Sequence, residues 1–122
     1  MKIFFSHSSS FDYKNQLYLP IKNYFKDSEF NFFFPEEQKI NTKEITKNSD
    51  LFFCELSYQS TGVAIETGWA DAYSKPIFCF YKNGTTVPTA YNYLTDNFYN
   101  YSTTQELLEK IQDVLTNFTF TN

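Results

Sequence analysis

The fold is decided by residues 49–76, which read SDLFFCELSYQSTGVAIETGWADAYSKP. The run Leu51–Leu56 is almost continuously apolar, as in a strand that is buried on both faces of a parallel sheet. A polar loop follows this strand, and Ser60 or Thr61 can cap a helix that begins at Gly62 and continues to Ser74. This segment therefore predicts a strand, a loop and a helix, the unit from which α/β proteins are built.

Small residues recur along the predicted helix at every fourth position, at Ala64, Gly68 and Ala72. We expect this strip to face the sheet, because small side chains let a helix approach the strands closely. Glu66 lies beside the strip, within the first turns of the helix. A carboxylate there is stabilised by the helix dipole and can point into a cleft at the carboxyl edge of the sheet.

The rest of the chain repeats the alternation of strands and helices. Further strands are expected at Lys2–Ser6, Phe30–Phe34, Pro76–Tyr81 and Phe98–Tyr101. Helices are expected at Phe11–Lys26, from Asn41 or Thr42 to Asn48, in a short segment that reaches Leu94, and at Thr103–Asn117. Pro20 must kink the first helix or mark an irregular start. The pattern predicts an α/β fold: one doubly wound domain over residues 1–122 with a mostly parallel, about five-stranded sheet, flavodoxin- or Rossmann-like.

Composition narrows the classes of function. The 122 residues include 21% aromatic and 20% charged residues, which excludes a disordered chain. All ten basic residues are lysines, so the sequence has no arginine, and the net charge is −4. A nucleic-acid polymer is therefore not an expected partner, because its binding needs a concentrated basic surface. No run of about 18 apolar residues is present, so no membrane span is expected.

Histidine and cysteine usage excludes a Cys/His metal site. The sole histidine is His7, and the two cysteines, Cys54 and Cys79, lie inside apolar runs. Buried, reduced thiols are typical of cytoplasmic proteins, and the residues after Lys2 leave no room for a signal peptide. We therefore expect a cytoplasmic protein without a metal and without a cofactor.

Ligands of doubly wound folds bind beyond the carboxyl ends of the strands. This rule draws attention to the loops Ser6–Ser10, Pro35–Gln38 and Ser57–Gly62. The serines of the first loop, Ser6, Ser8, Ser9 and Ser10, either bind an anion or cap the next helix. His7 either faces the cleft or forms the polar end of the first strand. Three aromatic side chains near these loops could stack on a nucleobase: Phe11, Tyr13 and Tyr58.

Residues 49–76 resemble the nucleoside 2-deoxyribosyltransferase superfamily, including its 2'-deoxynucleoside 5'-phosphate N-hydrolase branch. The matching features are Ser49-Asp50 before the strand, Gly62 in the loop, Glu66-Thr67-Gly68-Trp69-Ala70, and Lys75-Pro76. The resemblance implies that Glu66 is a nucleophile, which attacks C1' of a deoxyribose, expels the base and forms a glycosyl-enzyme ester. This is the logic of retaining glycosidases, in which a carboxylate stabilises an oxocarbenium-like transition state.

The resemblance also implies an acid that protonates the departing base, and here the sequence departs from the pattern. The family's aspartate, eight positions before Asp50, falls on Thr42. Asn41 or Glu44 could take its place if the helix register shifts. Asp50 and Glu55 are the remaining carboxylates of the strand. Asp50 either caps or orients the local backbone or takes part in catalysis, Glu55 could face the cleft from the end of the strand, and we include both in the predicted catalytic set with Glu66.

Six residues before the nucleophile, the resemblance separates transferases, which have an aspartate, from monophosphate hydrolases, which have a serine; this chain has Ser60. In the hydrolases an arginine of the first loop also contacts the phosphate, and Ser9 stands in its place. The predicted substrate-binding residues are Ser6, His7, Ser9, Ser60, Gly62 and Thr89, the last of these falling where a neighbouring subunit often contributes a hydroxyl. The implied partners are a deoxynucleoside or deoxynucleotide and a second copy of the chain, as a homodimer or larger oligomer.

Two alternatives remain open. The opening Phe4-Phe5-Ser6-His7-Ser8-Ser9 also resembles the first strand and loop of TIR domains, which would make the chain a nucleotide-sensing module with NAD as its ligand. The absence of an aspartate at Thr42 is also compatible with a relative whose catalytic set has decayed.

Overall fold

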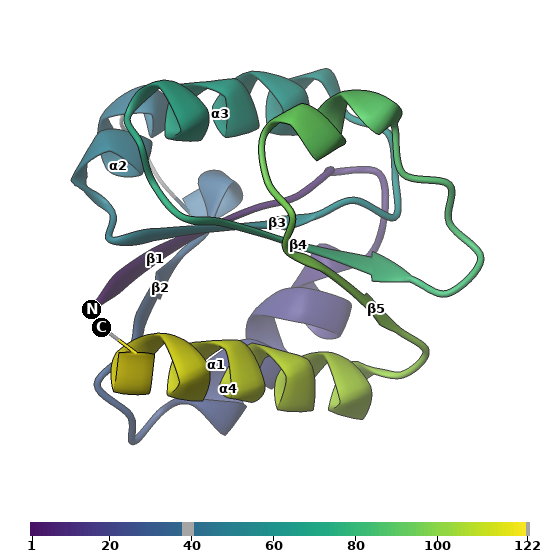
Figure 1. Cartoon of the computed structure of the whole chain (residues 1–122). Coiled ribbons are helices and arrows are strands. Elements are labelled where there is room, and N and C mark those ends of the chain that lie inside the picture. The colour runs from purple at the N-terminus through teal and green to yellow at the C-terminus, as the bar shows by residue number, and fades with distance from the viewer. Residues whose placement is uncertain (38–40, 122) are drawn as a thin grey trace.

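The computed structural model describes residues 1–37 and 41–121, with side chains to Phe118, and contains a five-stranded parallel sheet (Figure 1). The order of the strands is β2-β1-β3-β4-β5, and every neighbouring pair is parallel. The predicted α/β class and doubly wound arrangement are confirmed, with the flavodoxin-like order. The strands are β1 (Lys2–Ser6), β2 (Asn31–Phe33), β3 (Leu51–Glu55), β4 (Ile77–Lys82) and β5 (Phe98–Tyr101).

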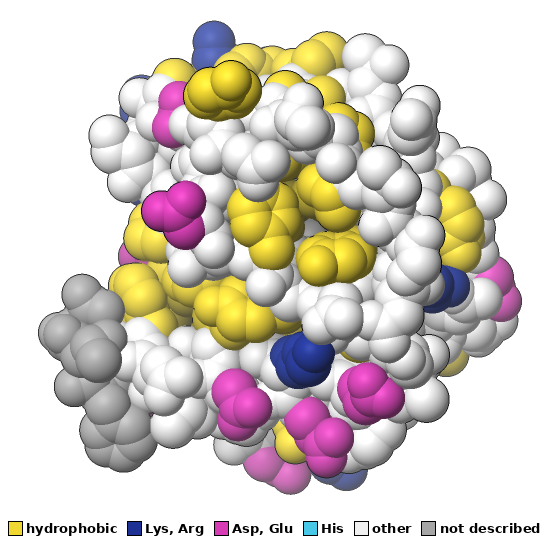
Figure 2. All heavy atoms as spheres, turned by 45° about the vertical axis from the view of Figure 1, so that its right-hand side comes forward, with side chains coloured by type: hydrophobic (Ala, Val, Ile, Leu, Met, Phe, Trp, Pro, Cys, Tyr) yellow, Lys and Arg dark blue, Asp and Glu magenta, His cyan; other side chains and the backbone are white. Residues whose placement is uncertain are grey.

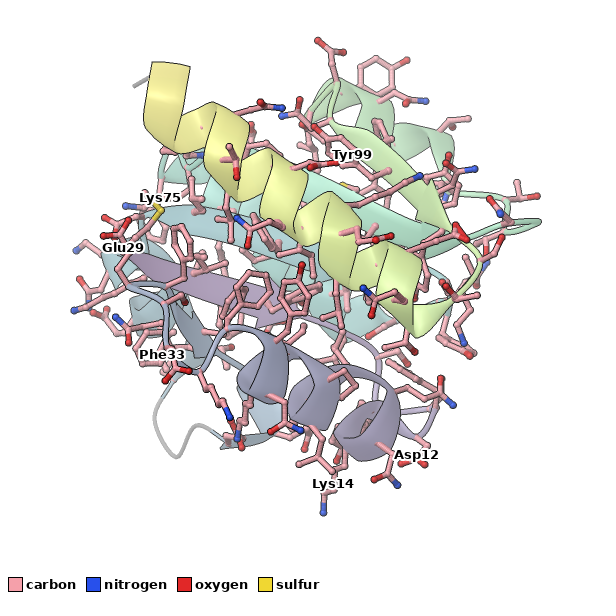
Figure 3. All side chains as sticks on the ribbon, turned by 90° about the horizontal axis from the view of Figure 1, so that it is seen from below. Asp12, Lys14, Glu29, Phe33, Lys75 and Tyr99 are labelled. Atoms are coloured by element: carbon pink, nitrogen blue, oxygen red, sulfur yellow. The ribbon has the colours of Figure 1, made fainter. Side chains whose placement is uncertain are left out.

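Helices cover both faces of the sheet. The upper layer in Figure 1 contains α2 and α3, and the lower layer contains α1 and α4, which lie side by side in Figure 3 as well. The α-helices are α1 (Leu19–Tyr24), α2 (Thr42–Asn48), α3 (Thr61–Ala72) and α4 (Thr104–Thr121). Shorter helical segments are η1 (Lys14–Tyr18), η2 (Pro35–Glu37) and η3 (Thr89–Tyr93). No helix within the described residues is long and apolar enough to cross a membrane.

Alternation along the strands divides the core into two halves. Phe5, Phe53 and Phe80 pack toward α1 and α4, whereas Phe4 and Phe52 pack toward α2 and α3. All five are fully buried, and each phenylalanine buried in this way stabilises the fold by about 1.5–3 kcal/mol. The same alternation decides which face each polar residue at the end of a strand occupies.

The first predicted helix begins later than expected and contains a widened turn. Residues 14–18 form a π-helical segment, η1, in which the Leu19 N–H donates to the Lys14 carbonyl. Pro20 follows in the first turn of α1, where its missing N–H disrupts the α-helical ladder. The irregular start that Pro20 predicted is therefore present, but the segment before Tyr13 is a loop.

The prediction that the small-residue strip faces the sheet is wrong. Ala64, Gly68 and Ala72 lie on the exposed side of α3, and a Cβ atom added at Gly68 would meet nothing within 4 Å. The sheet-facing side of α3 instead consists of Val63, Glu66, Thr67 and Ala70. The spacing of four identifies one face of the helix, but it does not show whether that face packs on the sheet or faces solvent.

The two cysteines are free and fully buried on adjacent strands, as the sequence predicted. Cys54 pairs with Cys79 across β3 and β4, and their Sγ atoms lie 3.3 Å apart. Burial raises the pKa of the Cys54 thiol well above its ordinary value. Within the described residues no cluster of histidine, cysteine or acidic side chains could hold a metal ion.

Candidate functional site

The carboxyl edge of the sheet brings Ser6 and Glu66 together. Ser6 is the last residue of β1, and its Oγ donates a 2.6 Å hydrogen bond to Oε1 of Glu66 in the second turn of α3. Ser6 is fully buried and Glu66 is 9% exposed. Ser6 lies two residues after Phe4 on β1, so both side chains point to the same face of the sheet, toward the layer that contains α3. Two predicted site residues from distant segments are therefore in direct contact.

The hydroxyl groups of Ser6 and Thr42 act on the Glu66 carboxylate. Burial raises the pKa of Glu66, because a charged carboxylate is poorly solvated there. The Ser6 hydroxyl opposes this effect most strongly, and the Thr42 hydroxyl also lowers the pKa of Glu66. The negative charge of Glu36 raises it. The result is a largely desolvated carboxylate, held by one strong hydrogen bond, at the edge where ligands of this fold bind.

Thr42 lies near the Glu66 carboxylate. As the first residue of α2 it lies close enough to Glu66 to influence its carboxylate. Its neighbour Asn41 is engaged elsewhere, since its side chain caps α2 by accepting a 2.8 Å hydrogen bond from the Lys43 N–H. Glu44 lies on the exposed side of α2. The position to which the resemblance assigns the family's aspartate is therefore near Glu66, and a threonine occupies it.

Glu55 lies on the other face of the sheet. It lies two residues after Phe53 on β3, so its side chain points to the same face as that of Phe53, which packs toward α1 and α4. Its carboxylate is 1% exposed and accepts hydrogen bonds from the Ser57 N–H at 2.6 Å, the Ser57 hydroxyl at 2.7 Å, and the Tyr101 hydroxyl. Burial raises the pKa of Glu55, and these donors partly offset the effect. The structure gives Glu55 the contacts of a structural anchor for the β3–α3 loop and does not bring it to Glu66.

Asp50 lies at the opposite edge of the sheet from Glu66. It precedes β3, and its Oδ2 accepts a 2.7 Å hydrogen bond from the Lys2 N–H, while its own N–H donates to the Lys2 carbonyl. These contacts fix the amino ends of β1 and β3. Because the site lies at the carboxyl ends, the predicted catalytic set is divided, with Glu66 alone at the site.

The loop after β1 is ordered by its own side chains. His7 is 5% exposed; its Nε2 hydrogen-bonds the Tyr18 hydroxyl at 2.6 Å, and its Nδ1 hydrogen-bonds the Ser8 carbonyl at 2.8 Å. Burial lowers the pKa of His7. The Ser8 hydroxyl is bonded to Ser10, and Ser9 is exposed. The helix that follows has no side-chain cap, and both Ser9 and Ser10 are exposed.

The aromatic residues proposed to stack on a base stack on one another. Phe11 and Tyr58, from the loops after β1 and β3, lie with ring centroids 4.6 Å apart at 11°. Tyr13 packs on the His7 ring at 4.7 Å. Lys82 at the end of β4 completes the cluster, since its Nζ lies 5.2 Å from the Tyr58 ring centroid and 2.9 Å from the Tyr58 hydroxyl. The sequence prediction missed Lys82, although its position at the carboxyl end of a buried strand could have identified it.

A groove of about 630 Å³ lies at the N-terminus of α3. Ser60 caps this helix, with its Oγ accepting a 3.3 Å hydrogen bond from the Val63 N–H, and Gly62 lies exposed in the first turn. Five hydroxyl-bearing residues other than tyrosines line the groove: Ser57, Ser60, Thr61, Thr85 and Thr86. Thr89 is exposed beside it, between the lining residues Pro88 and Ala90. Glu66 is not among the residues that line this groove.

The loop after β2 supplies a carboxylate that the sequence prediction did not single out. Glu36 lies in η2, and its charge acts on Glu66, His7 and Tyr18. It also lines a groove of about 650 Å³ together with Tyr13 and Tyr18. The loop Pro35–Gln38 was predicted to lie near the site; of its residues, Glu36 acts on Glu66 by its charge, and Gln38 lies outside the described residues.

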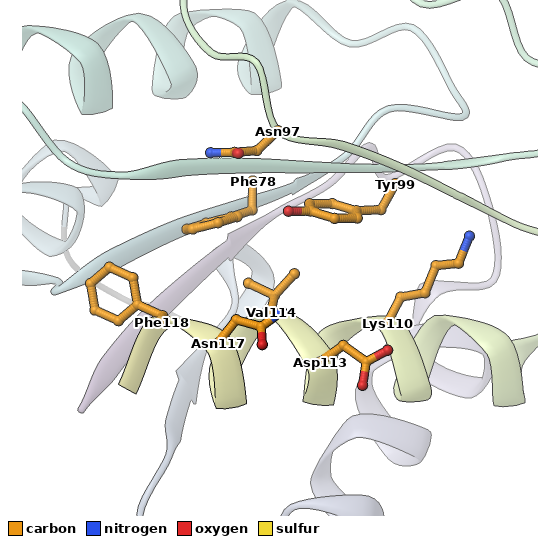
Figure 4. A pocket seen from close by; sticks show the side chains of 8 residues that line it. All are labelled: Phe78, Asn97, Tyr99, Lys110, Asp113, Val114, Asn117 and Phe118. Atoms are coloured by element: carbon orange, nitrogen blue, oxygen red, sulfur yellow. The ribbon is translucent and has the colours of Figure 1, made fainter. Parts of the chain in front are cut away.

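On the face shown in Figure 2, lysine side chains stand singly rather than in a patch. A further groove, of about 480 Å³, lies between β5 and α4 (Figure 4). Phe78 and Tyr99 line it from the sheet, and Val114 and Phe118 line it from α4. None of the predicted site residues reaches this groove.

Two solved structures share this architecture. The CMP N-glycosidase BcmB of Clostridium botulinum superposes with a TM-score of 0.71 at 19% identity, covering 92% of this chain and 99% of that chain. The 2-deoxyribosyltransferase of the psychrotolerant bacterium Bacillus psychrosaccharolyticus superposes with a TM-score of 0.64 at 18% identity, covering 88% and 90%. The chain has the fold of the nucleoside 2-deoxyribosyltransferase superfamily. No protein-family model and no curated protein sequence matches the chain. The resemblance seen in residues 49–76 is confirmed at the level of the fold.

Proposed function

We propose that the chain cleaves, or transfers across, the N-glycosidic bond of 2'-deoxynucleosides or their 5'-monophosphates, with Glu66 as the nucleophile. The observation that carries the proposal is the buried contact between Ser6 Oγ and Glu66 Oε1 at the carboxyl edge of the sheet. The shared fold supports it, because the two similar structures are an N-glycosidase that acts on CMP and a 2-deoxyribosyltransferase.

The environment of Glu66 suits a nucleophile. In the first step a carboxylate oxygen of Glu66 bonds to C1', and the electron pair of the C1'–N bond leaves with the base. In the second step water or another base attacks C1', the bond between C1' and the Glu66 oxygen breaks, and Glu66 is again a carboxylate. Ser6 holds Oε1 by its hydrogen bond, so the carboxylate meets the developing positive charge on the sugar without reorienting.

The hydroxyl-lined groove supports a polar 5' end of the substrate. Ser60 and Thr61 lie at the N-terminus of α3, where the backbone N–H groups and the helix dipole favour an anion. Ser9 is exposed on the neighbouring loop. A phosphate bound there would be held by hydroxyls and N–H groups, since the chain has no arginine to clamp it.

Base release tests this function. The wild-type protein is incubated with the common deoxynucleosides, their 5'-monophosphates, CMP and NAD, each with and without a second free base, and the products are separated by chromatography. We expect release from a deoxynucleoside or deoxynucleotide, and its loss in Glu66→Gln. The matched control is Glu44→Gln, an exposed carboxylate of α2, which should retain the wild-type rate. Cleavage of NAD alone would favour the TIR-like alternative, and no release from any compound would contradict the proposal.

The predicted homodimer also remains a proposal. Ile65 on α3 is 49% exposed, and Tyr93 on η3, in the same helical layer, is 90% exposed. Contiguous exposed apolar patches are typical of surfaces that pack against another copy, and we propose that these two side chains belong to one. Light scattering should give twice the monomer mass, and Ile65→Lys should lower it. A monomer mass for the wild-type protein would contradict the prediction.

A further inference from the structure

Glu55 is a buried carboxylate that the proposed reaction does not use. Its side chain lies on the opposite face of the sheet from Glu66, and burial raises the pKa of Glu55. A buried carboxylate is costly unless hydrogen-bond donors satisfy it. Three donors do so here, the N–H and the hydroxyl of Ser57 and the hydroxyl of Tyr101. The carboxylate therefore ties the start of the β3–α3 loop to the last residue of β5.

Ser57 also connects the two segments that line the hydroxyl-rich groove. The groove of about 630 Å³ is lined from residues 56–64 and from residues 85–91. Ser57 belongs to the first segment, and its Oγ accepts a 2.7 Å hydrogen bond from the Lys82 N–H. The Lys82 carbonyl in turn accepts a 3.1 Å hydrogen bond from the N–H of Thr85, where the second segment begins. Two hydrogen bonds through Lys82 therefore join the two segments.

Glu55 fixes the direction in which the Ser57 hydroxyl points. A hydroxyl has one proton to donate, and Ser57 donates it to Oε2 of Glu55 at 2.7 Å. The lone pairs of Oγ are then free to accept from the Lys82 N–H. The Ser57 N–H donates to Oε1 at 2.6 Å and the Tyr101 hydroxyl donates to Oε2, so both oxygens of the carboxylate are held. The Ser57 hydroxyl is therefore a fixed part of the groove wall, and its proton is committed to Glu55.

Building on the proposed function, we propose that Glu55, held by Tyr101, is a positioning residue that shapes the groove for the 5'-phosphate of a deoxynucleoside monophosphate. Glu55 is 1% exposed, so it acts through Ser57 and not on the substrate. The hydroxyls that would bind the phosphate are those of the other lining residues: Ser60, Thr61, Thr85 and Thr86. They come from both segments, so phosphate binding depends on the spacing that Ser57 and Lys82 fix. A 5'-hydroxyl has one oxygen and makes fewer such contacts.

Tyr101→Phe tests this role without altering the groove, because Tyr101 is not among its lining residues. Base release is measured with a deoxynucleoside and with its 5'-monophosphate, for wild type, Tyr101→Phe and Glu55→Gln. In both variants we expect KM for the monophosphate to rise about 10-fold and kcat to change less than about 2-fold. KM for the nucleoside should change less than about 2-fold. Tyr99→Phe is the matched control, since this tyrosine of β5 lines the groove beside α4, and it should leave every constant unchanged.

The outcomes separate this inference from the proposed function. An unchanged KM for the monophosphate, an equal rise in KM for both substrates, or a fall in kcat alone would overturn the inference. A wild-type protein that releases bases from nucleosides but not from their monophosphates would also overturn it, and the proposed function would stand. If the wild-type protein releases no base from either substrate, the proposed function itself fails. Circular dichroism at the assay temperature, expected to match wild type in all three variants, excludes unfolding as the cause of a raised KM.

Discussion

The hydroxyl of the fully buried Ser6 donates a hydrogen bond to Glu66, and the substitution Ser6→Ala removes it. The Oγ–Oε1 distance of 2.6 Å is typical of a hydroxyl that donates to an ionised carboxylate. Hydrogen bonds to charged groups stabilise by about 1.5–3 kcal/mol. Unfolding entropy of about 2.1 cal/mol/K per residue makes 1 kcal/mol equivalent to roughly 4 °C for a chain of 122 residues. At pH 8 we therefore expect Ser6→Ala to lower the Tm by about 6–12 °C.

A double-mutant cycle assigns this loss to the charge on Glu66. Wild type, Ser6→Ala, Glu66→Gln and the double variant are melted at pH 8 and followed by circular dichroism. A hydrogen bond between neutral groups is worth only about 0.5–1.5 kcal/mol. We therefore expect Ser6→Ala to cost about half as much, or less, when Glu66 is already glutamine. Equal costs in both backgrounds would refute the account of Ser6 as the group that stabilises the carboxylate. Ser9→Ala, which changes an exposed hydroxyl, is the control and should leave the Tm unchanged.

Three further predictions follow from the same structure. Gly68→Ala should raise stability by about 0.5–1 kcal/mol in urea unfolding, because the added methyl meets open space on α3; a loss would mean that this face is packed. The thiols of Cys54 and Cys79 should react with an aromatic disulfide reagent only after denaturation, and reaction in the native protein would contradict their burial. Because burial raises the pKa of Glu55, the contribution of this group to stability is present at acidic pH and is lost as the pH rises from about 4.5 through the folded-state pKa. In urea titrations Glu55→Gln should therefore flatten the fall of stability with pH. An unchanged slope in this variant would contradict the prediction.

The fold was predictable from sequence because its signals are local and strong. The continuous apolar runs of β1, β3 and β4 predicted a parallel sheet covered on both faces, and this is what the structure has. The sequence predicted a cap of α3 at Ser60 or Thr61, and the structure assigns it to Ser60. The irregular helix start at Pro20 followed from the missing N–H.

The site was predictable only in part, because it depends on which way side chains point. Glu66 and Ser6 were both named, but only the three-dimensional structure shows that they touch. Glu55 and Asp50 lie in the predicted segment but not beside Glu66. Side chains alternate along β3, and this places Glu55 on the other face of the sheet. Asp50 lies at the amino end of β3, whereas Glu66 lies at the carboxyl edge. Glu36, whose charge acts on Glu66, was not singled out because its short segment carries no periodic pattern.

The central claim, that Glu66 attacks C1', is tested most directly by trapping the sugar on the protein. The wild-type protein is mixed with an accepted deoxynucleoside or deoxynucleotide, quenched in acid within the first turnover, and digested for peptide mass spectrometry. The account predicts a deoxyribosyl or deoxyribosyl-phosphate ester on the peptide that contains Glu66, and no such adduct in Glu66→Gln. Base release by the wild-type protein with an ester on another residue, or an undiminished rate in Glu66→Gln, would contradict it.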